Sequence, residues 1–369
     1  MNRLRALTGC GQAVWLDYIR RDLLEDGELA RLVCEDGVSG VTSNPAIFQQ
    51  AIGESELYDD QLREIIAVES DISTESLYER LAVTDIRLAA DVLQPVYEAT
   101  GGADGYVSLE VSPHLARDTE GTIAEAHRFW TLVDRPNLMI KVPATEEGIP
   151  AIEQLLADGI NVNITLMFSL RHYEDVARAY LRGVARNLHP EGVASVASFF
   201  VSRVDSAIDK RLEAIDDEQA RSLCGAIAVA NSKVTYQRFL EIFHGEPFSS
   251  LVARGARRQR VLWASTSTKN PDYRDVLYVE ELVGPETVNT VPPATVEAFR
   301  DHGEVAETLT CGLAEARASL SLLESLGVSL DDVTEELQRQ GLAKFAEPFD
   351  RLLATLDEKR RRLSEVVAG

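Results

Sequence analysis

Residues 138–143 read Leu-Met-Ile-Lys-Val-Pro and place one lysine, Lys141, inside an apolar run. Apolar residues that close on a proline are typical of the end of a buried strand. Burial disfavours the charged form of an amine, and a neutral lysine amine is a nucleophile that can form a Schiff base with a carbonyl. The same side chain could instead snorkel or form an ion pair at the strand end. This run alone leaves both interpretations open.

Similar segments recur along the chain and alternate with amphipathic stretches, which is typical of repeated βα units around a parallel sheet. The predicted strands are residues 13–17, 40–44, 105–111, 137–142, 160–166, 195–201, 260–266 and 287–293. The predicted helices are residues 26–35, 76–93, 122–133, 149–158, 170–187, 205–212 and 217–243. Eight strands favour an α/β protein with a closed (β/α)8 TIM barrel. A doubly wound sheet is the alternative, although no glycine-rich dinucleotide turn follows the first strand.

Two connections are too long for a single crossover. Residues 45–104 and 202–259 predict extra helices inserted after strands 2 and 6. The tail from residue 304 to 369 is also predicted to be helical, with Leu-rich helical periodicity near residues 320–326. No linker rich in Pro, Gly or Ser divides the chain. We therefore expect one barrel domain over residues 1–369, with residues 304–369 packed on it as a helical segment.

Composition narrows the class of partner. The 369 residues carry a formal charge of −23, which argues against nucleic acid or an anionic membrane as the main partner. The four cysteines, Cys10, Cys34, Cys224 and Cys311, lie far apart and show neither disulfide nor zinc spacing. We see no secretory signal and no run of about 18 apolar residues that would predict a membrane span. A cytoplasmic enzyme without a bound metal is the expectation.

Polar residues lie at or near the carboxyl ends of six predicted strands, where barrel active sites are assembled. They are Asp17, Asn44, Glu110, Lys141, Asn163, Thr165, Ser198 and Arg203. Singly, each has an ordinary explanation, such as a helix cap or a salt bridge. Together they suit Schiff-base aldol chemistry, which needs an amine, a base and a proton shuttle. The iminium is itself the electron sink, so this chemistry requires no cofactor. Amides suit a polyhydroxylated substrate, and the Arg203 guanidinium suits a phosphate.

Six motifs carry a resemblance to the transaldolase family over almost the whole chain. They are GVTSNPAIF at residues 40–48, DGYVSLEVSP at 104–113, NLMIKVPAT at 137–145, GINVNITLMFS at 159–169, SFFVSR at 198–203 and WASTSTKNP at 263–271. The chain length and the STKNP ending are similar to the longer bacterial and plant-type branch. The resemblance implies an enzyme of the non-oxidative pentose phosphate pathway that acts on sugar phosphates.

The resemblance also implies roles for individual residues. Lys141 would form the Schiff base with C2 of fructose 6-phosphate or sedoheptulose 7-phosphate, and Asp17 would remove the C4 hydroxyl proton. Glu110, through a water that Thr165 helps to hold, would be the acid and base of imine formation. The dihydroxyacetone unit would stay on Lys141 until erythrose 4-phosphate or glyceraldehyde 3-phosphate accepts it.

The substrate-binding residues follow from the same resemblance. Asn44 and Asn163 would bind the three-carbon unit, and Ser198 and Arg203 the far end and the phosphate. Where some members of the family carry a second phosphate-binding arginine after the seventh strand, this chain offers Lys269. Two alternatives remain at this point: a related Schiff-base aldolase that releases free dihydroxyacetone, and a catalytically silent barrel that acts as a binding protein. A homodimer also remains open, because the tail could cover the site or pack against a second subunit.

Overall fold

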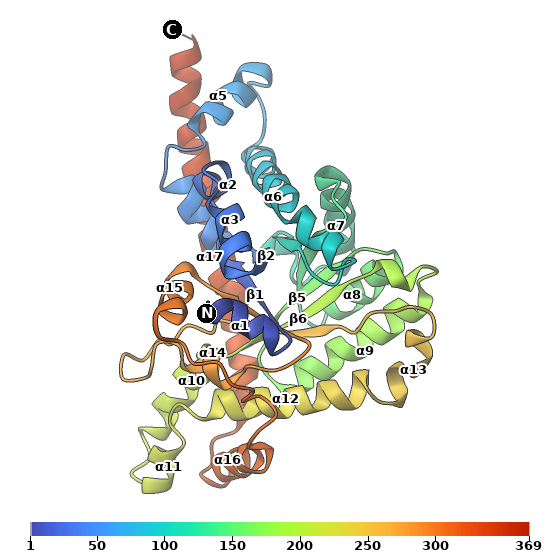
Figure 1. Cartoon of the computed structure of the whole chain (residues 1–369). Helices are drawn as coiled ribbons and strands as arrows, with labels where there is room; N and C mark the ends of the chain where they lie inside the picture. The colour runs from blue at the N-terminus through green and yellow to red at the C-terminus, as the bar shows by residue number, and fades with distance from the viewer. Residues whose placement is uncertain (1, 369) are drawn as a thin grey trace.

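The computed structural model describes residues 2–368, and its centre is a closed barrel of eight parallel strands in sequence order (Figure 1). The strands are β1 Gln12–Asp17, β2 Val38–Thr42, β3 Tyr106–Glu110, β4 Leu138–Pro143, β5 Val162–Met167, β6 Ser195–Phe200, β7 Arg260–Ala264 and β8 Thr287–Val291. Because β1 pairs with both β2 and β8, the sheet has closed on itself. The predicted TIM barrel is confirmed, and the doubly wound alternative is wrong.

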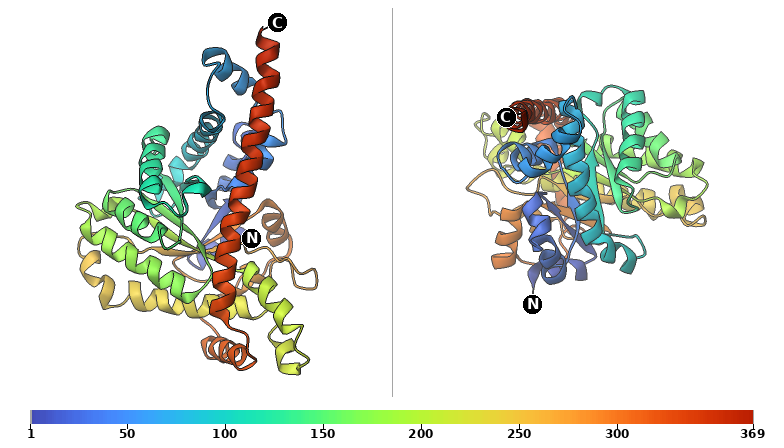
Figure 2. Two further views of the ribbon diagram at one scale, coloured as in Figure 1. Left: turned by 180° about the vertical axis from the view of Figure 1, so that it is seen from behind. Right: turned by 90° about the horizontal axis from the view of Figure 1, so that it is seen from above.

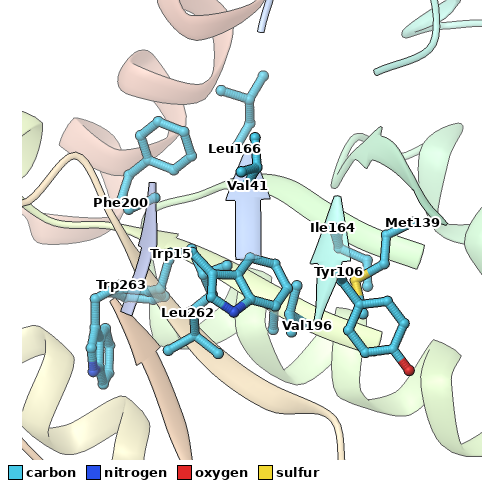
Figure 3. Close-up of a cluster of buried hydrophobic side chains, with 14 of the residues drawn as sticks. Trp15, Val41, Tyr106, Met139, Ile164, Leu166, Val196, Phe200, Leu262 and Trp263 are labelled. Carbon is cyan, nitrogen blue, oxygen red and sulfur yellow. The ribbon is translucent and has the colours of Figure 1, made fainter. Parts of the chain in front are cut away.

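Burial explains why the strand segments are so apolar. In β3, β4, β5 and β6 every residue is buried, since helices cover the outside of the barrel and side chains fill the inside. Figure 3 shows part of this core, where Trp15 of β1, Val41 of β2 and Trp263 of β7 contribute to one hydrophobic cluster. Gly40 makes room for the Trp15 indole, because a Cβ on Gly40 would lie 2.5 Å from the ring.

Helices surround the barrel and fill the two long connections. Ahead of β3 lie α1 Arg3–Gly9, α2 Arg21–Glu25, α3 Glu28–Arg31, α4 Pro45–Phe48, α5 Asp59–Val68 and α6 Thr74–Ala99. Then come α7 Thr119–Val133, α8 Gly148–Ala157, α9 Leu170–Arg186, α10 Ser202–Leu212, α11 Glu218–Ser222, α12 Ile227–Phe243 and α13 Glu246–Val252. The last are α14 Leu277–Glu281, α15 Pro293–His302, α16 Leu313–Ser325 and α17 Leu330–Ala368. Both long connections therefore hold several helices, as predicted, whereas α1, α2, α14 and α15 lie outside the predicted helices.

The helix predicted for residues 217–243 is wrong as a single element. It is divided into α11 and α12 at Gly225, whose φ of +73° is in the left-handed region that glycine adopts without strain. The Gly225 amide donates to Asp209 Oδ1 at 3.0 Å. A Cβ at this position would also meet the Tyr273 ring at 2.8 Å. The break is thus set by contacts with α10 and with the loop after β7.

The C-terminal helix α17 is 39 residues long and runs along one side of the molecule, past the barrel to α5 (Figure 2). It contacts α4, α6, α10 and β5 on its way. Gln338 of α17 donates to the carbonyl oxygen of Ala144, just after β4, at 2.9 Å and to that of Leu166, near the carboxyl end of β5, at 3.1 Å. None of the described helices combines the length and apolar character needed to cross a lipid bilayer.

Candidate active site

Lys141 is buried near the carboxyl end of β4, with only 6% of its side chain exposed. Its Nζ lies 3.3 Å from Oε2 of Glu110, the residue opposite it on β3, and donates to the Ser43 carbonyl oxygen at 3.1 Å. The lysine is therefore inside the barrel mouth rather than snorkelling to solvent. These two oxygens hold the amine at a defined position.

Glu110 is a candidate acid–base group beside this amine. Burial raises the pKa of Glu110 to about 7, and the opposing charge of Lys141 limits the increase. Its Oε2 is buried and, within residues 2–368, has no hydrogen-bond partner beyond the ion pair. A carboxyl with this pKa is able both to donate and to accept a proton near neutral pH.

Asp17 ends β1 on the other side of the same space. Its Oδ1 accepts a hydrogen bond from Thr42 Oγ1 at 2.7 Å, and Thr42 is itself 2.8 Å from the Thr290 hydroxyl. Burial raises the pKa of Asp17 above its usual range, while Lys141 and the Thr42 hydrogen bond act in the opposite direction. Asp17 is thus a candidate base that is oriented by a hydroxyl of the neighbouring strand.

A cavity of about 220 Å³ lies between these groups at the carboxyl end of the barrel. Seven of the nine predicted site residues line it: Asp17, Asn44, Lys141, Thr165, Ser198, Arg203 and Lys269. Thr165 Oγ1 is buried there and is without a hydrogen-bond partner among the described residues. The structure therefore brings most of the predicted residues to one small, polar space.

Two of the predicted site residues do not line this cavity. Asn163 is fully buried; its amide donates to Ser108 Oγ at 3.0 Å, and its carbonyl accepts from Ser198 Oγ at 2.7 Å. Asn163 therefore orients Ser198, which does line the cavity. Glu110 lies behind Lys141 and lines a different cavity. Asn44 lines both cavities and also caps α4, because its Oδ1 accepts from the Ile47 amide at 3.1 Å.

The far end of the cavity is cationic. Arg203, in the first turn of α10, packs over the Phe200 ring at 5.0 Å, and its buried Nη1 has no partner among the described residues. Burial lowers the pKa of Arg203. The Lys269 side chain is exposed at the rim and donates to Ser267 Oγ at 2.8 Å. Desolvation of its ammonium group, followed by the charge of Arg203, lowers the pKa of Lys269. Neither cation has a carboxylate partner among the residues that the structure describes, and together they provide a place for a phosphate.

Comparison with known proteins agrees with this geometry. A sequence profile of the Transaldolase/Fructose-6-phosphate aldolase family matches residues 14–356. The chain belongs to this family. It is 49% identical to the transaldolase of Thiobacillus denitrificans, over 96% of this chain and 100% of the relative. It is 51% identical to the transaldolase of Thermobifida fusca, over 95% of this chain and 96% of the relative. It is 44% identical to transaldolase 2 of Nostoc sp., over 99% of this chain and 100% of the relative. The predicted family is confirmed.

Sequence reasoning missed several residues that line this transaldolase-family cavity: Thr42, Phe200, Ala264, Ser265, Ser267, Thr290, Pro292 and Phe345. Phe345 of α17 lines the cavity, with its ring centroid 5.5 Å from Lys141 Nζ, and is only 7% exposed. It reaches the site because α17 lies close against the end of β5, where a Cβ on Gly341 would be 2.8 Å from Leu166. Nothing in the pattern of the tail distinguishes Phe345 from an ordinary apolar helix residue.

Proposed function

We propose that this chain is a transaldolase of the non-oxidative pentose phosphate pathway. It transfers a dihydroxyacetone unit from sedoheptulose 7-phosphate or fructose 6-phosphate to glyceraldehyde 3-phosphate or erythrose 4-phosphate. The observation that carries this proposal is the buried Lys141 amine, held 3.3 Å from Glu110 at one end of a cavity whose other end is cationic. Relatives that carry the name transaldolase along their full length support it.

Imine formation begins when the Lys141 amine attacks C2 of the donor ketose. Glu110 then protonates the carbinolamine hydroxyl, through a water held by Thr165, and that hydroxyl leaves as water. The carboxylate that remains lies next to the new iminium, whose charge it balances. The pKa of Glu110, raised to about 7 by burial, suits both this protonation and the reverse step.

Carbon–carbon cleavage follows on the bound imine. Asp17 removes the C4 hydroxyl proton, C4 becomes an aldehyde, and the electrons of the C3–C4 bond move to the iminium to give an enamine on Lys141. The released aldose phosphate leaves. The enamine then attacks the aldehyde of an acceptor, Asp17 returns the proton, and hydrolysis of the imine frees the product.

The remaining residues position the sugar. Asn44 offers its amide group to the three-carbon unit, while Asn163 contributes by orienting the Ser198 hydroxyl. Arg203 and Lys269 bind the phosphate at the cationic end. This arrangement selects substrates by the distance between the carbon that forms the Schiff base and the phosphate.

Borohydride trapping in the presence of fructose 6-phosphate, followed by peptide mass mapping, tests the proposal. We expect a reduced three-carbon or six-carbon adduct on Lys141 and no turnover by the Lys141→Ala variant. An adduct on another lysine would favour the silent binding protein. So would a result in which neither the wild type nor Lys141→Ala turns over substrate and both bind the sugar equally well. Release of dihydroxyacetone as the main product, even with an acceptor present, would favour the related aldolase.

We also propose that residues 1–369 form one domain, with the segment 304–369 packed on the barrel. The contacts of α16 with α12, and of α17 with the helices after β2 and β6, support this division. Homodimer formation and a cytoplasmic location stay predictions. Light scattering of the purified protein tests the first, and cell fractionation tests the second.

A further inference from the structure

A second cavity, of about 300 Å³, lies behind Glu110. It is enclosed by the ends of β2 and β3, by α6 and α7, and by α17. Its lining includes Ser112, Phe48, Tyr78, Phe349 and Leu353. The substrate cavity is on the opposite side of the Lys141–Glu110 ion pair, so this pair stands between the two spaces.

The second cavity leads from solvent to the buried carboxyl group. Its rim includes His114 and Asp350, which are 2.8 Å apart and have side chains that are 53% and 59% exposed. Its inner end is Glu110, whose side chain is 6% exposed and whose Oε2 has, among the described residues, no partner besides the Lys141 ammonium. A water molecule at this inner end would supply a second donor.

The substrate cavity offers water a poorer route. A donor sugar bound as proposed would fill the space between Lys141 and Arg203, and Phe345 covers the amine from α17. Yet each turnover must expel one water when the imine forms, because the C2 oxygen leaves, and must admit one water when the product imine is hydrolysed. That water has to reach and leave the C2 atom next to Glu110 while the sugar is in place.

We propose that the cavity behind Glu110 is the passage through which this water enters and leaves the active site. The inference rests on the transaldolase function proposed above. Glu75, Glu79 and Glu125 line the passage, and one cation, Arg128, pairs with Glu79 at 2.5 Å and with Glu125 at 3.4 Å. The remaining negative charge disfavours sugar phosphates but not water. Its aromatic wall is well packed, with Tyr78 in edge contact with Phe48 at 5.8 Å and with Phe349 at 5.3 Å. Water and substrate therefore use separate entrances.

Oxygen exchange at C2 tests the passage directly. Fructose 6-phosphate incubated with the full-length enzyme in H2 18O acquires label at C2 each time an imine forms and is hydrolysed. Ser112→Phe places a ring in the passage without touching the substrate cavity, which Ser112 does not line. We expect this variant to exchange oxygen roughly tenfold more slowly or worse, because it withholds the water on which acid–base catalysis by Glu110 acts. Cleavage of the preformed imine, followed by borohydride quench, should keep the wild-type rate.

Matched variants make the outcome decisive. Ser321→Phe adds the same ring on the exposed face of α16 and should behave as wild type. Leu353→Phe narrows the passage from α17 and should reproduce the effect if Ser112→Phe does not fold. The proposed passage would be contradicted if the passage variants exchanged oxygen at a rate within about twofold of wild type. It would also be contradicted if they slowed oxygen exchange and imine cleavage equally. A wild-type enzyme with no exchange and no Lys141 adduct would instead overturn the proposed function.

Discussion

Phe345, from the C-terminal helix, lies over Lys141 with 5.5 Å between its ring centroid and the Nζ atom. The proposed Schiff-base lysine of the barrel is therefore covered by a residue from outside the barrel. A transaldolase must protect its enamine from protonation by water until the acceptor arrives. An apolar ring above the amine contributes to that protection by excluding water from the substrate side.

Replacing Phe345 by leucine should increase hydrolytic release of the donor. The smaller side chain leaves room for water next to Lys141, while leucine preserves an apolar contact and the helix. We expect Phe345→Leu to release free dihydroxyacetone severalfold faster than wild type when no acceptor is present. An enzymatic assay for dihydroxyacetone measures this. Phe248→Leu, which alters a buried phenylalanine on α13, is the control, and equal release by both variants would contradict the shielding role.

The pH dependence of imine formation should report Glu110. Burial raises the pKa of this carboxyl to about 7, so it loses its proton as the pH rises through neutrality. Protonation of the carbinolamine hydroxyl then becomes slower, and the rate of imine formation should fall relative to its value in slightly acid solution. Stopped-flow trapping gives the profile. Glu110→Gln keeps the shape but cannot titrate, so its profile should lack the change of slope near pH 7.

Asp17 and Glu110 should control different steps. Glu110→Ala removes the proton donor for dehydration and should slow imine formation more than cleavage. Asp17→Ala removes the base for the C4 hydroxyl and should stall cleavage, so that the six-carbon adduct accumulates on Lys141. Single-turnover borohydride trapping separates the two adducts by mass. Equal accumulation of the six-carbon adduct in both variants would show that the roles are assigned wrongly.

Arg203 and Lys269 should matter for phosphorylated donors only. Loss of a hydrogen bond to a charged group costs about 1.5–3 kcal/mol, so Arg203→Ala should raise KM for fructose 6-phosphate roughly 10–100-fold. Lys269 is exposed at the rim, and its loss should raise KM by less than about tenfold. Steady-state assays with free fructose provide the comparison, since neither variant should change its use. Arg178→Ala, at an exposed ion pair of α9, is the control.

Asp17→Asn should stabilise the protein increasingly as the pH rises. The raised pKa of Asp17 means that the folded protein keeps this proton to a higher pH than the unfolded chain does. Between the unfolded and folded pKa values the folded state binds more protons, so the free energy of unfolding falls as the pH rises. Asparagine does not titrate, so it removes this fall in the free energy of unfolding, and its side-chain oxygen can still accept the hydrogen bond from Thr42. The gain in Tm over wild type should be larger at about pH 8 than at about pH 4, and a gain independent of pH would contradict this explanation.

The pattern of the chain was enough to predict the barrel and the chemistry. Eight apolar segments alternating with amphipathic helices predict β1 to β8 because a strand buried on both faces needs a continuous apolar run. Lys141, Glu110 and Asp17 were selected as candidates because burying a polar residue costs free energy unless it has a partner, so its presence in such a run indicates a partner or a function. These signals lie within a few neighbouring residues, and the sequence displays them directly.

Contacts between distant segments were decided by the tertiary structure alone. Asn163 and Thr165 look equivalent in the sequence, since both alternate with apolar residues on β5, but the first is engaged by Ser108 and Ser198 and only the second lines the cavity. The break at Gly225, the placement of Phe345 over Lys141, and the second cavity behind Glu110 likewise depend on packing between elements far apart in the chain. The physical reason is that periodicity determines which face of an element is buried, whereas the partner of that face is selected by the packing of the whole molecule.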